Sequence, residues 1–453
     1  MSELLGSIWW LLVSIGVLVT IHEYGHYWVA RRCGVKVLRF SIGFGPALWM
    51  RRGQDGTEYA IAAIPLGGYV RMLDEREGDV AASELAFAFN RQSVWKRIAI
   101  VLAGPVANLL LCVALFWGMF VIGRPDFVPV VGQAKGLAAA GGLQPGDQIL
   151  AVGARETPTW SEANMALITA ALDRTDVPLR IRSAGGVEGQ RQLPLSRLPA
   201  TFDERNAIAV IGLTPRHRLV PAVIGAVVPG KPAWGVLAEG DRVTAIDGTP
   251  IAAWDDITPL VQRLGNAGGT AMVEVQRKGE RLALELQPVR ARNEAGTPYW
   301  QLGIDYARPS EPVEDTVRRY GPLQAVPAAL GESVHQTREL FAMIGRAFAG
   351  RVSVRNTVAG PITIGRAANS VASHGPAWYL QLLAMLSLSL GILNLLPIPI
   401  LDGGHLLYYL IELAKGSPVS ERVMAAGQYV GLALIASLMG LAFFNDIVNN
   451  LVN

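Results

Sequence analysis

Four long stretches without a charged residue constrain this chain more than any other feature of its sequence. A helix needs about 20 consecutive apolar residues to cross the hydrocarbon core of a bilayer. Hydrophobic residues make up 51% of the 453 residues, which is high for a soluble enzyme. The sequence therefore predicts a polytopic α-helical membrane protein with four transmembrane helices, at Leu4–Ile21, Ile98–Gly123, Gly375–Leu401 and Val423–Asn445.

The first apolar stretch does not have the features of a cleaved signal peptide. Glu3 precedes it without any Lys or Arg, and no small-residue cleavage site follows it. We therefore expect residues 4–21 to form a retained transmembrane helix.

The distribution of positive charge predicts the orientation of the helices. Residues 31–97 contain eleven Lys or Arg, whereas residues 1–3 and 446–453 contain none. The connection after the third helix carries Lys415 and Arg422. Because positively charged loops stay in the cytoplasm, residues 31–97 and 402–422 are predicted to lie inside, and both termini and the long middle segment outside.

Charge and cysteine content exclude several other classes of protein. The formal net charge is only +3, which gives no reason to expect a nucleic-acid partner. The two cysteines, Cys33 and Cys112, lie outside the hydrophilic middle of the chain and are too few for a thiolate zinc site.

Glycines and prolines punctuate residues 34–75 and separate short apolar pieces such as Tyr59–Ile64 and Tyr69–Met72. This pattern predicts a β-hairpin or small sheet that is associated with the membrane. Irregular backbone at membrane depth requires burial in protein or a cavity. A simple cytoplasmic loop is the alternative.

The middle of the chain contains an internal repeat. Leu143–Trp160 and Leu237–Trp254 align without a gap at an offset of 94 residues, and both contain a Gly-Asp turn followed by a strand-like segment. Two α+β units of about 90 residues each are expected. The Leu-x-x-Gly-Asp-x-Ile/Val pattern resembles PDZ domains, and generic β-rich modules are the alternative.

An amphipathic helix is predicted within residues 309–372. Val334, Phe341, Ile344 and Phe348 recur at helical spacing beside charged side chains. Such a helix could lie on the outer membrane surface or pack against the repeated units.

The motif His22-Glu23-Tyr24-Gly25-His26 follows the first apolar stretch directly. Residues four apart share one face of a helix, so both imidazoles can reach one zinc ion. Glu23 can then take a proton from the attacking water. The 18 preceding residues span about 27 Å as a helix, and ionisable residues at membrane depth are functional by default.

A catalytic zinc usually takes a third ligand from the protein. By the predicted topology, His217, His335 and His374 lie on the opposite side of the membrane. Asp402 and His405 remain, both after the Pro-interrupted end of the third helix. Asp402 is favoured because it lies nearer to the apolar stretch.

The HEYGH motif on a first transmembrane helix, with Asn-x-x-Pro-x-Pro-x-Leu-Asp-Gly at residues 394–403, resembles the site-2 protease family of intramembrane zinc metalloproteases. Two PDZ-like domains between the second and third helices are similar to those of bacterial members. Gly104-Pro105 and Asn108 match the Gly-Pro-x-x-Asn motif of the family. The resemblance covers essentially the whole chain.

The resemblance implies roles for particular residues. Asn394 would help to hold the substrate backbone or the oxyanion, and Gly67, Gly68 and Tyr69 would belong to a membrane-dipping β-loop that pairs with an unwound substrate strand. The implied catalytic set consists of the Zn²⁺ ligands His22, His26 and Asp402 and the general base Glu23.

The resemblance also implies a substrate and a location. The substrates would be single-pass transmembrane proteins, such as an anti-sigma factor trimmed outside during an envelope stress response. The site would lie near the cytoplasmic side of the bacterial inner membrane, with the PDZ-like domains and both termini in the periplasm. The implied domains are residues 1–123, 125–215, 216–308, 309–372 and 373–453.

Two other functions are compatible with parts of the sequence. A membrane-anchored HExxH protease could digest soluble or misfolded proteins, and its third ligand would typically be a Glu on a cytoplasmic helix. A PDZ membrane scaffold with an inactive site is the second alternative, and the intact Glu23 argues against it.

Overall fold

The chain folds into two compact units, each described by itself below. The membrane-spanning unit comprises Met1–Arg124 and Arg318–Asn453, and the inserted unit comprises Pro125–Val317. The computed structural model describes residues 3–199, 202, 206–293, 296–307, 312–350 and 359–448.

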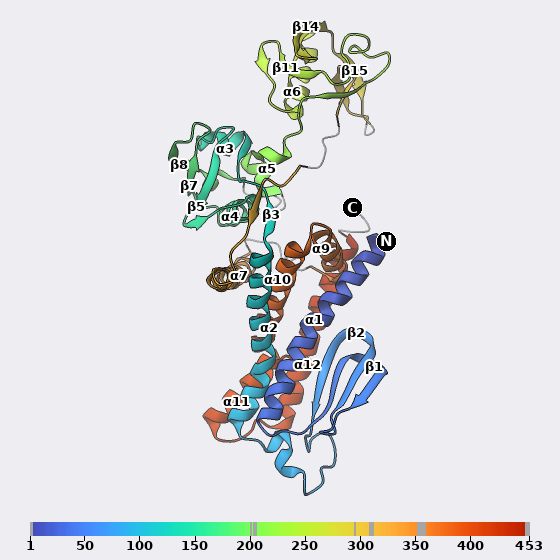
Figure 1. Ribbon diagram of the computed structural model, residues 1–453, viewed down its shortest axis with the longest axis vertical. Helices are drawn as coiled ribbons and strands as arrows, with labels where there is room; N and C mark the ends of the chain where they lie inside the picture. The colour runs from blue at the N-terminus through green and yellow to red at the C-terminus, as the bar shows by residue number, and fades with distance from the viewer. Residues whose placement is uncertain are drawn as a thin grey trace. The chain divides into compact units, whose positions relative to one another are not determined.

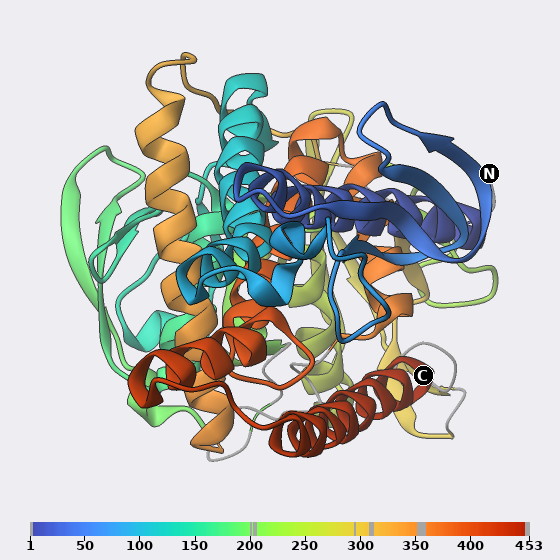
Figure 2. The same ribbon diagram turned by 90° about the horizontal axis from the view of Figure 1, so that it is seen from below.

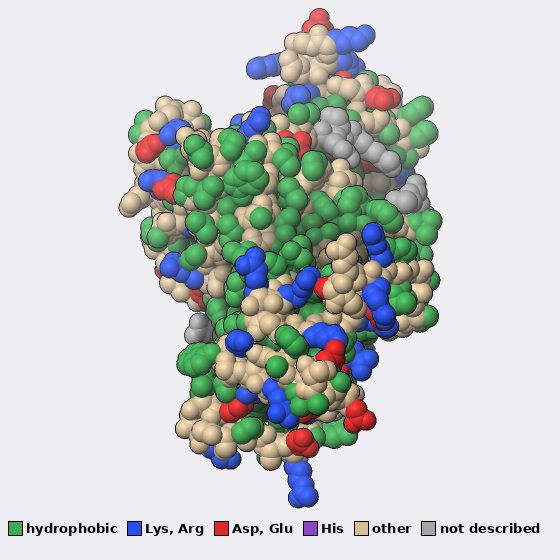
Figure 3. Space-filling view, turned by 60° about the horizontal axis from the view of Figure 1, so that its bottom comes forward, with side chains coloured by type: hydrophobic (Ala, Val, Ile, Leu, Met, Phe, Trp, Pro, Cys, Tyr) green, Lys and Arg blue, Asp and Glu red, His purple; other side chains and the backbone are tan. Residues whose placement is uncertain are grey.

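Four helices of the membrane-spanning unit are long and apolar enough to cross a membrane, as predicted (Figure 1). In the space-filling view, hydrophobic side chains form a broad surface, and charged side chains gather below it (Figure 3). The four helices are α1 (Glu3–Arg32), α2 (Val94–Ile122), α10 (Pro376–Leu395) and α12 (Glu421–Ile447).

Small residues allow α1, α2 and α10 to approach closely. A methyl group on Gly25 of α1 would collide with the backbone carbonyl of Ala103 on α2. A methyl group on Gly391 of α10 would lie 3.1 Å from the carbonyl oxygen of Pro105 on α2. Close backbone contacts of this kind are a main source of helix association in membranes, and they hold the first and third spans against α2.

The third span is shorter than the sequence predicted. Helix α10 ends at Leu395 rather than continuing through Leu401, because Pro397 and Pro399 lack the amide hydrogen that a helix requires. The following connection, residues 402–422, is also largely helical: α11 runs from Asp402 to Lys415.

The predicted β-hairpin region forms a sheet beside α1 (Figure 1). Strand β1 (Val37–Arg52) bends near Gly45, and β2 (Glu58–Met72) bends near Gly67, so the two strands supply four segments to the sheet. The pairing gives the order 47–52, 58–62, 37–42 and 68–72 across the sheet. Segments 47–52 and 68–72 are therefore its two edges.

The predicted amphipathic helix is α7 (Ala325–Phe348). Its small side chains, Ala325 and Ala329, pack in a buried cluster with Phe120 of α2. The larger Val334 and Phe341, which were predicted to define the apolar face, are exposed. The side chain of Phe348 lies outside the described residues.

Helix α9 and two short 3₁₀ turns also belong to the described part of the membrane-spanning unit. Helix α9 (Pro361–Ser373) packs against α1, and a methyl group on Gly365 would lie 3.0 Å from the Ser7 carbonyl oxygen. Viewed from below, the β1–β2 sheet lies on one side of α1, and α12 lies on the other (Figure 2). The short 3₁₀ turns η1 (Leu85–Phe87) and η2 (Phe89–Arg91) precede α2.

The repeated segments of the inserted unit fold alike. Each contributes a four-stranded antiparallel sheet, in the orders β6-β5-β7-β8 and β12-β11-β13-β14, with one longer helix. Each sheet has its own buried apolar core. The first repeat contains β5 (Gln148–Val152), β6 (Arg155–Glu156), α4 (Trp160–Asp173), β7 (Val177–Arg182) and β8 (Glu188–Leu193). The second contains β11 (Arg242–Ile246), β12 (Thr249–Pro250), α6 (Ile257–Ala267), β13 (Ala271–Arg277) and β14 (Glu280–Leu286).

Short strands and helices connect these sheets. The strands pair as β4 with β9, β10 with β17, β15 with β16, and β3 with β18. Their bounds are β3 (Arg124–Asp126), β4 (Val131–Ala134), β9 (Leu213–Pro215), β10 (Ile224–Val227), β15 (Val289–Arg292), β16 (Pro298–Gln301), β17 (Ile304–Tyr306) and β18 (Thr316–Arg318), with helices α3 (Gly136–Ala140) and α5 (Ala207–Ile211).

Candidate metal centre

The HEYGH motif lies on α1, where the helix leaves its apolar stretch. His22 and His26 are one turn apart and face the same direction, with their Nε2 atoms 3.2 Å apart. Both side chains are buried between α1 and α2. The helix therefore presents two imidazole nitrogens to one point, as the spacing predicted.

Asp402 reaches the same point from the other end of the chain. Its Oδ2 atom lies 3.1 Å from His22 Nε2 and 3.4 Å from His26 Nε2. Asp402 opens helix α11, directly after a turn in which Ile400 has a φ of +92°. A β-branched residue rarely adopts this conformation, and such strain concentrates at functional sites.

Gly403 and Gly404 allow the turn before α11 to fold tightly over the start of that helix. A Cβ atom on Gly403 would collide with the Leu396 carbonyl, and one on Gly404 with the Ile398 carbonyl. The two glycines lie within a regular helix and permit this close approach.

The Nε2 atoms of His22 and His26 and the Oδ2 atom of Asp402 are spaced to fit a zinc ion. Ligands about 2.0–2.2 Å from a tetrahedral zinc lie about 3.3–3.5 Å apart, close to the observed 3.1, 3.2 and 3.4 Å. Asp402 Oδ2 is buried and has no hydrogen-bond partner, which is costly for an anionic oxygen unless a cation is bound. Among the described residues, this trio is the one His/Cys/Asp/Glu group that could hold a metal.

Two groups on α2 orient the histidine rings. The Ile100 carbonyl oxygen lies 2.8 Å from His26 Nδ1, so that nitrogen donates and leaves Nε2 free. The Asn108 carboxamide lies 3.2 Å from His22 Nδ1. In the sequence, Asn108 was recognised only as part of a family motif and was given no role. Its contact with His22 joins residues 86 positions apart, and a pairing over that distance cannot be predicted from local spacing.

Gly104 leaves the space that the two rings occupy. A methyl group at this position would collide with the rings of both His22 and His26. The contacts with Ile100 and Asn108 fix the positions of both rings, so overpacking of about 1–3 kcal/mol is expected in Gly104→Ala. We expect zinc affinity to fall by at least about tenfold, measured by competition with a chelator.

A second glycine on the same helix provides the control. A methyl group on Gly118 would meet only Leu380 Cδ1, at 3.5 Å, which is an ordinary contact. Gly118→Ala should therefore bind zinc as the unaltered protein does. Equal zinc affinity in the two variants would show that the space beside Gly104 is not needed.

Four of the five other predicted site residues line one cavity of about 890 Å³. Glu23, Gly68, Tyr69 and Asn394 all line it with the trio, whereas Gly67 does not. A methyl group on Gly68 would lie 3.2 Å from Glu23 Cγ. The absence of a side chain at Gly68 therefore lets the edge segment 68–72 run directly beside the candidate base.

The other histidines do not join the trio. His405 lines the cavity, but it is not part of the described metal-binding group. Burial lowers the pKa of the His405 imidazole. His217 stacks on Phe127 in the inserted unit, and His374 bonds the Ser370 carbonyl on α9.

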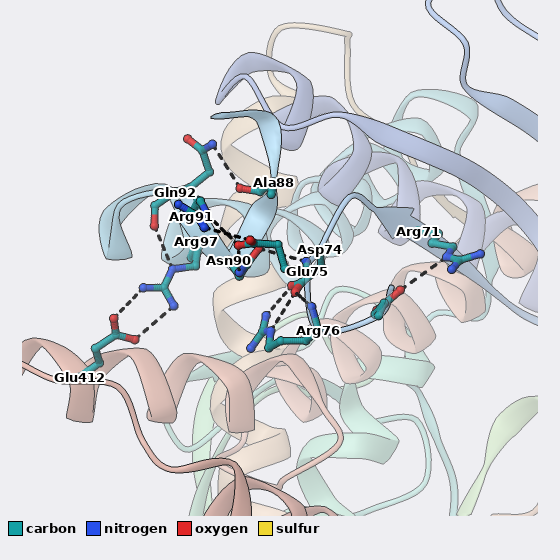
Figure 4. A network of polar contacts seen from close by, with 11 residues as sticks. Arg71, Asp74, Glu75, Arg76, Ala88, Asn90, Arg91, Gln92, Arg97 and Glu412 are labelled. Carbon is teal, nitrogen blue, oxygen red and sulfur yellow. Dashed lines mark hydrogen bonds and ion pairs between the residues drawn. The ribbon is translucent and has the colours of Figure 1, made fainter. Parts of the chain in front are cut away.

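A polar network holds the end of the bundle that carries the trio (Figure 4). Arg97 of α2 donates two hydrogen bonds to Glu412 of α11, at 2.6 and 3.2 Å, and both side chains are nearly buried. The guanidinium of Arg97 also lies over the ring of Tyr409, 4.8 Å from its centroid. The pair thus ties α11, and with it Asp402, to the helix that orients the histidines.

The loop between the sheet and α2 has its own ion pairs (Figure 4). Asp74 accepts two side-chain hydrogen bonds from Arg76. Hydrogen bonds from Arg91 and Asn90 lower the pKa of the Glu75 carboxyl to about 2. The contacts of Glu75 were not predictable from the sequence, since no spacing rule pairs loop residues 15 or 16 positions apart.

Comparison with known proteins places the chain among membrane metalloproteases. The profile of peptidase family M50 matches residues 10–438. Over 448 residues, the chain is 52% identical to a protein of Xylella fastidiosa (strain Temecula1) that carries a zinc metalloprotease name, covering 99% of this chain and 100% of that protein. It is 40% identical over 439 residues to the regulator of sigma-E protease RseP of Escherichia coli (strain K12), covering 96% and 97%. It is 38% identical over 451 residues to the protease RseP of Yersinia pestis, covering 98% and 99%.

Proposed function

Because this chain belongs to peptidase family M50 and is a zinc metalloprotease, we propose that it cleaves single-pass transmembrane proteins within their apolar segments. One observation carries the proposal: His22 and His26 lie on α1, a helix long enough to span a membrane, and Asp402 follows shortly after the end of α10, a second such helix. An active site built there meets its substrate inside the bilayer.

His22, His26 and Asp402 are the proposed zinc ligands, and Glu23 is the proposed base. Bound zinc supplies a Lewis acid that activates water and polarises a carbonyl. Glu23 accepts a proton from the attacking water and can return it to the leaving amine. Asn394 lines the same cavity and can donate a hydrogen bond to the oxygen of the attacked carbonyl.

The edge segment 68–72 is the proposed docking strand for the substrate. A transmembrane helix hides its carbonyls in its own hydrogen bonds, so cleavage requires a locally extended chain. Segment 68–72 pairs with residues 37–42 on one side only, which leaves its other side open for strand addition beside Glu23. In this proposal, Gly67 and Tyr69 help to shape and position the edge that binds the substrate. They take no part in the bond-breaking step.

The decisive experiment locates the peptide bond that is cleaved in a transmembrane substrate. Purified protein should cleave a single-pass substrate within its apolar segment, located by mass spectrometry of both products, and should leave unfolded casein intact. Cleavage of casein without cleavage of the transmembrane substrate would support the quality-control alternative instead. Membership of family M50 and its metalloprotease relatives exclude the alternative of an inactive scaffold.

The repeated units of the inserted region are proposed to be PDZ-like domains that filter substrates. The relatives' names include regulators of sigma-E, which supports an anti-sigma factor, already trimmed outside, as the substrate class. Deletion of residues 125–308 should leave zinc binding unchanged, since no proposed ligand lies there. The shortened enzyme should also cleave untrimmed substrate, detected by immunoblotting of the transmembrane fragment. A folded deletion variant that still rejects untrimmed substrate would contradict the filter.

The proposed location is the bacterial inner membrane, with both termini and the PDZ-like domains in the periplasm. A cysteine placed within residues 160–170 should react with a membrane-impermeant maleimide in cells with a permeabilised outer membrane. A cysteine placed at Gly416 should react only after the inner membrane is also opened. The reverse labelling pattern would invert the topology and place the zinc site near the periplasm.

A further inference from the structure

The β1–β2 sheet carries a second cavity, of about 470 Å³, which the proposed protease mechanism does not use. Phe40, Ile42, Trp49, Tyr59 and Ile61 give it a mainly apolar lining. Polar groups, Arg51, Arg52 and Gln54, lie at one end of it, near the turn that joins β1 to β2. We call this cavity the sheet groove.

The sheet groove is separate from the zinc site. It lies on segments 37–42, 47–52 and 58–62, whereas the substrate strand 68–72 forms the opposite edge of the sheet. No residue that lines the groove also lines the cavity around the candidate zinc ligands. A ligand in the groove would therefore leave the docking strand free.

Contacts with α1 fix the depth of the groove. Asp55, in the turn between β1 and β2, forms a 3.1 Å ion pair with Arg31 at the charged end of α1. The turn thus lies where the apolar helix meets water. From Arg52 back to Ala47 the strand extends about 17 Å towards the apolar part of α1, and Leu48 and Met50 on this strand are 74% and 54% exposed. Such side chains are stable in contact with lipid.

The polar end of the groove is positively charged. Glu58 pairs with both Arg39 and Arg52, at 2.6 and 2.9 Å. Arg51 forms no ion pair with any residue that the structure describes. With the Arg31–Asp55 pair included, four arginines face two carboxylates, which leaves two positive charges at the level of the lipid headgroups.

We propose that the sheet groove binds an anionic phospholipid. One acyl chain lies along Ile42, Trp49 and Ile61, and the phosphate lies at Arg51, where guanidinium groups bind phosphate well. The exposed Trp49 ring sits between these two regions, as aromatic side chains do at membrane interfaces. This inference goes beyond the proposed protease function and does not depend on it.

Native mass spectrometry of the full-length protein in detergent can test the site. The probes are phosphatidylglycerol and phosphatidylcholine with identical acyl chains. We expect stronger retention of phosphatidylglycerol, and a loss of about fivefold in Arg51→Gln, since one basic side chain near a membrane surface contributes about 1 kcal/mol to binding an anionic lipid. Trp49→Ala should weaken retention of both lipids.

Arg32→Gln is the matched control, because Arg32 lies at the same end of α1, outside the groove, where it stacks on Trp28. It should retain phosphatidylglycerol as the unaltered protein does. Zinc content, which does not involve the groove, reports whether each variant is folded. Equal losses in Arg51→Gln and Arg32→Gln, equal retention of the two lipids, or displacement of the lipid by inorganic phosphate alone would each overturn the proposal.

Discussion

Glu23→Gln is expected to reduce proteolysis by at least about 100-fold while the protein keeps its zinc. The glutamine occupies the same volume on α1, and the proposed ligands remain in place, so the metal should stay bound. The substitution removes the carboxylate that accepts a proton, and general base catalysis typically contributes about 10²–10⁴-fold. Zinc content by atomic absorption, together with the cleavage rate of a transmembrane substrate, measures both quantities on one sample.

His22→Ala provides the contrast to this result. It removes a proposed ligand and should lose zinc and activity together, whereas Glu23→Gln should lose only activity. A Glu23→Gln protein that cleaves at the rate of the unaltered enzyme would refute the assignment of the base. A Glu23→Gln protein without zinc would make Glu23 a structural part of the metal site instead.

Asp402→Asn should weaken zinc binding by at least about 100-fold and abolish cleavage. The substitution preserves the shape of the side chain but removes the negative charge that faces two imidazoles at 3.1 and 3.4 Å. Loss of a group that merely orients a ligand typically costs about 10–100-fold in metal affinity, and loss of a ligand should cost more. Competition with a chelator of known affinity measures the change.

His405→Ala is the control for Asp402→Asn, because both side chains line the same cavity. His405 lies outside the group of three ligand atoms, so its variant should keep its zinc and substantial activity. Normal zinc binding and turnover in Asp402→Asn, together with loss of both in His405→Ala, would transfer the role of third ligand to His405.

The centre of the candidate site was predictable because its chemistry is local. His22, Glu23 and His26 lie within one turn of a helix, whose geometry fixes their relative positions. Asp402 was predictable for a different reason: an acid next to a long apolar stretch needs a cation nearby. The number of apolar helices followed from the four uncharged stretches of the sequence, since each is about as long as a helix that crosses a bilayer.

The parts that were not predictable depend on packing between distant segments. The contact of Asn108 with His22 and the pair of Arg97 with Glu412 join residues 86 and 315 positions apart. Helix α11 was missed because residues 402–415 carry charges and follow two prolines, which on their own indicate a loop. The four-segment form of the sheet arises from bends near Gly45 and Gly67 that let each strand pair more than once.

The position of the HEYGH motif on α1 also determines what becomes of the products. Nine residues separate His22 from Arg31, so a bond cut beside His22 lies about 14 Å from the charged end of the helix. One product then keeps a hydrophobic tail of about nine residues or fewer, far short of the 20 that hold a segment in a bilayer. If the substrate is cut within the membrane as proposed, that fragment would dissociate without any extraction machinery, while the other would stay anchored. Dilution would then keep the two products from rejoining, so the proposed cleavage would release irreversibly whatever the substrate held at the membrane.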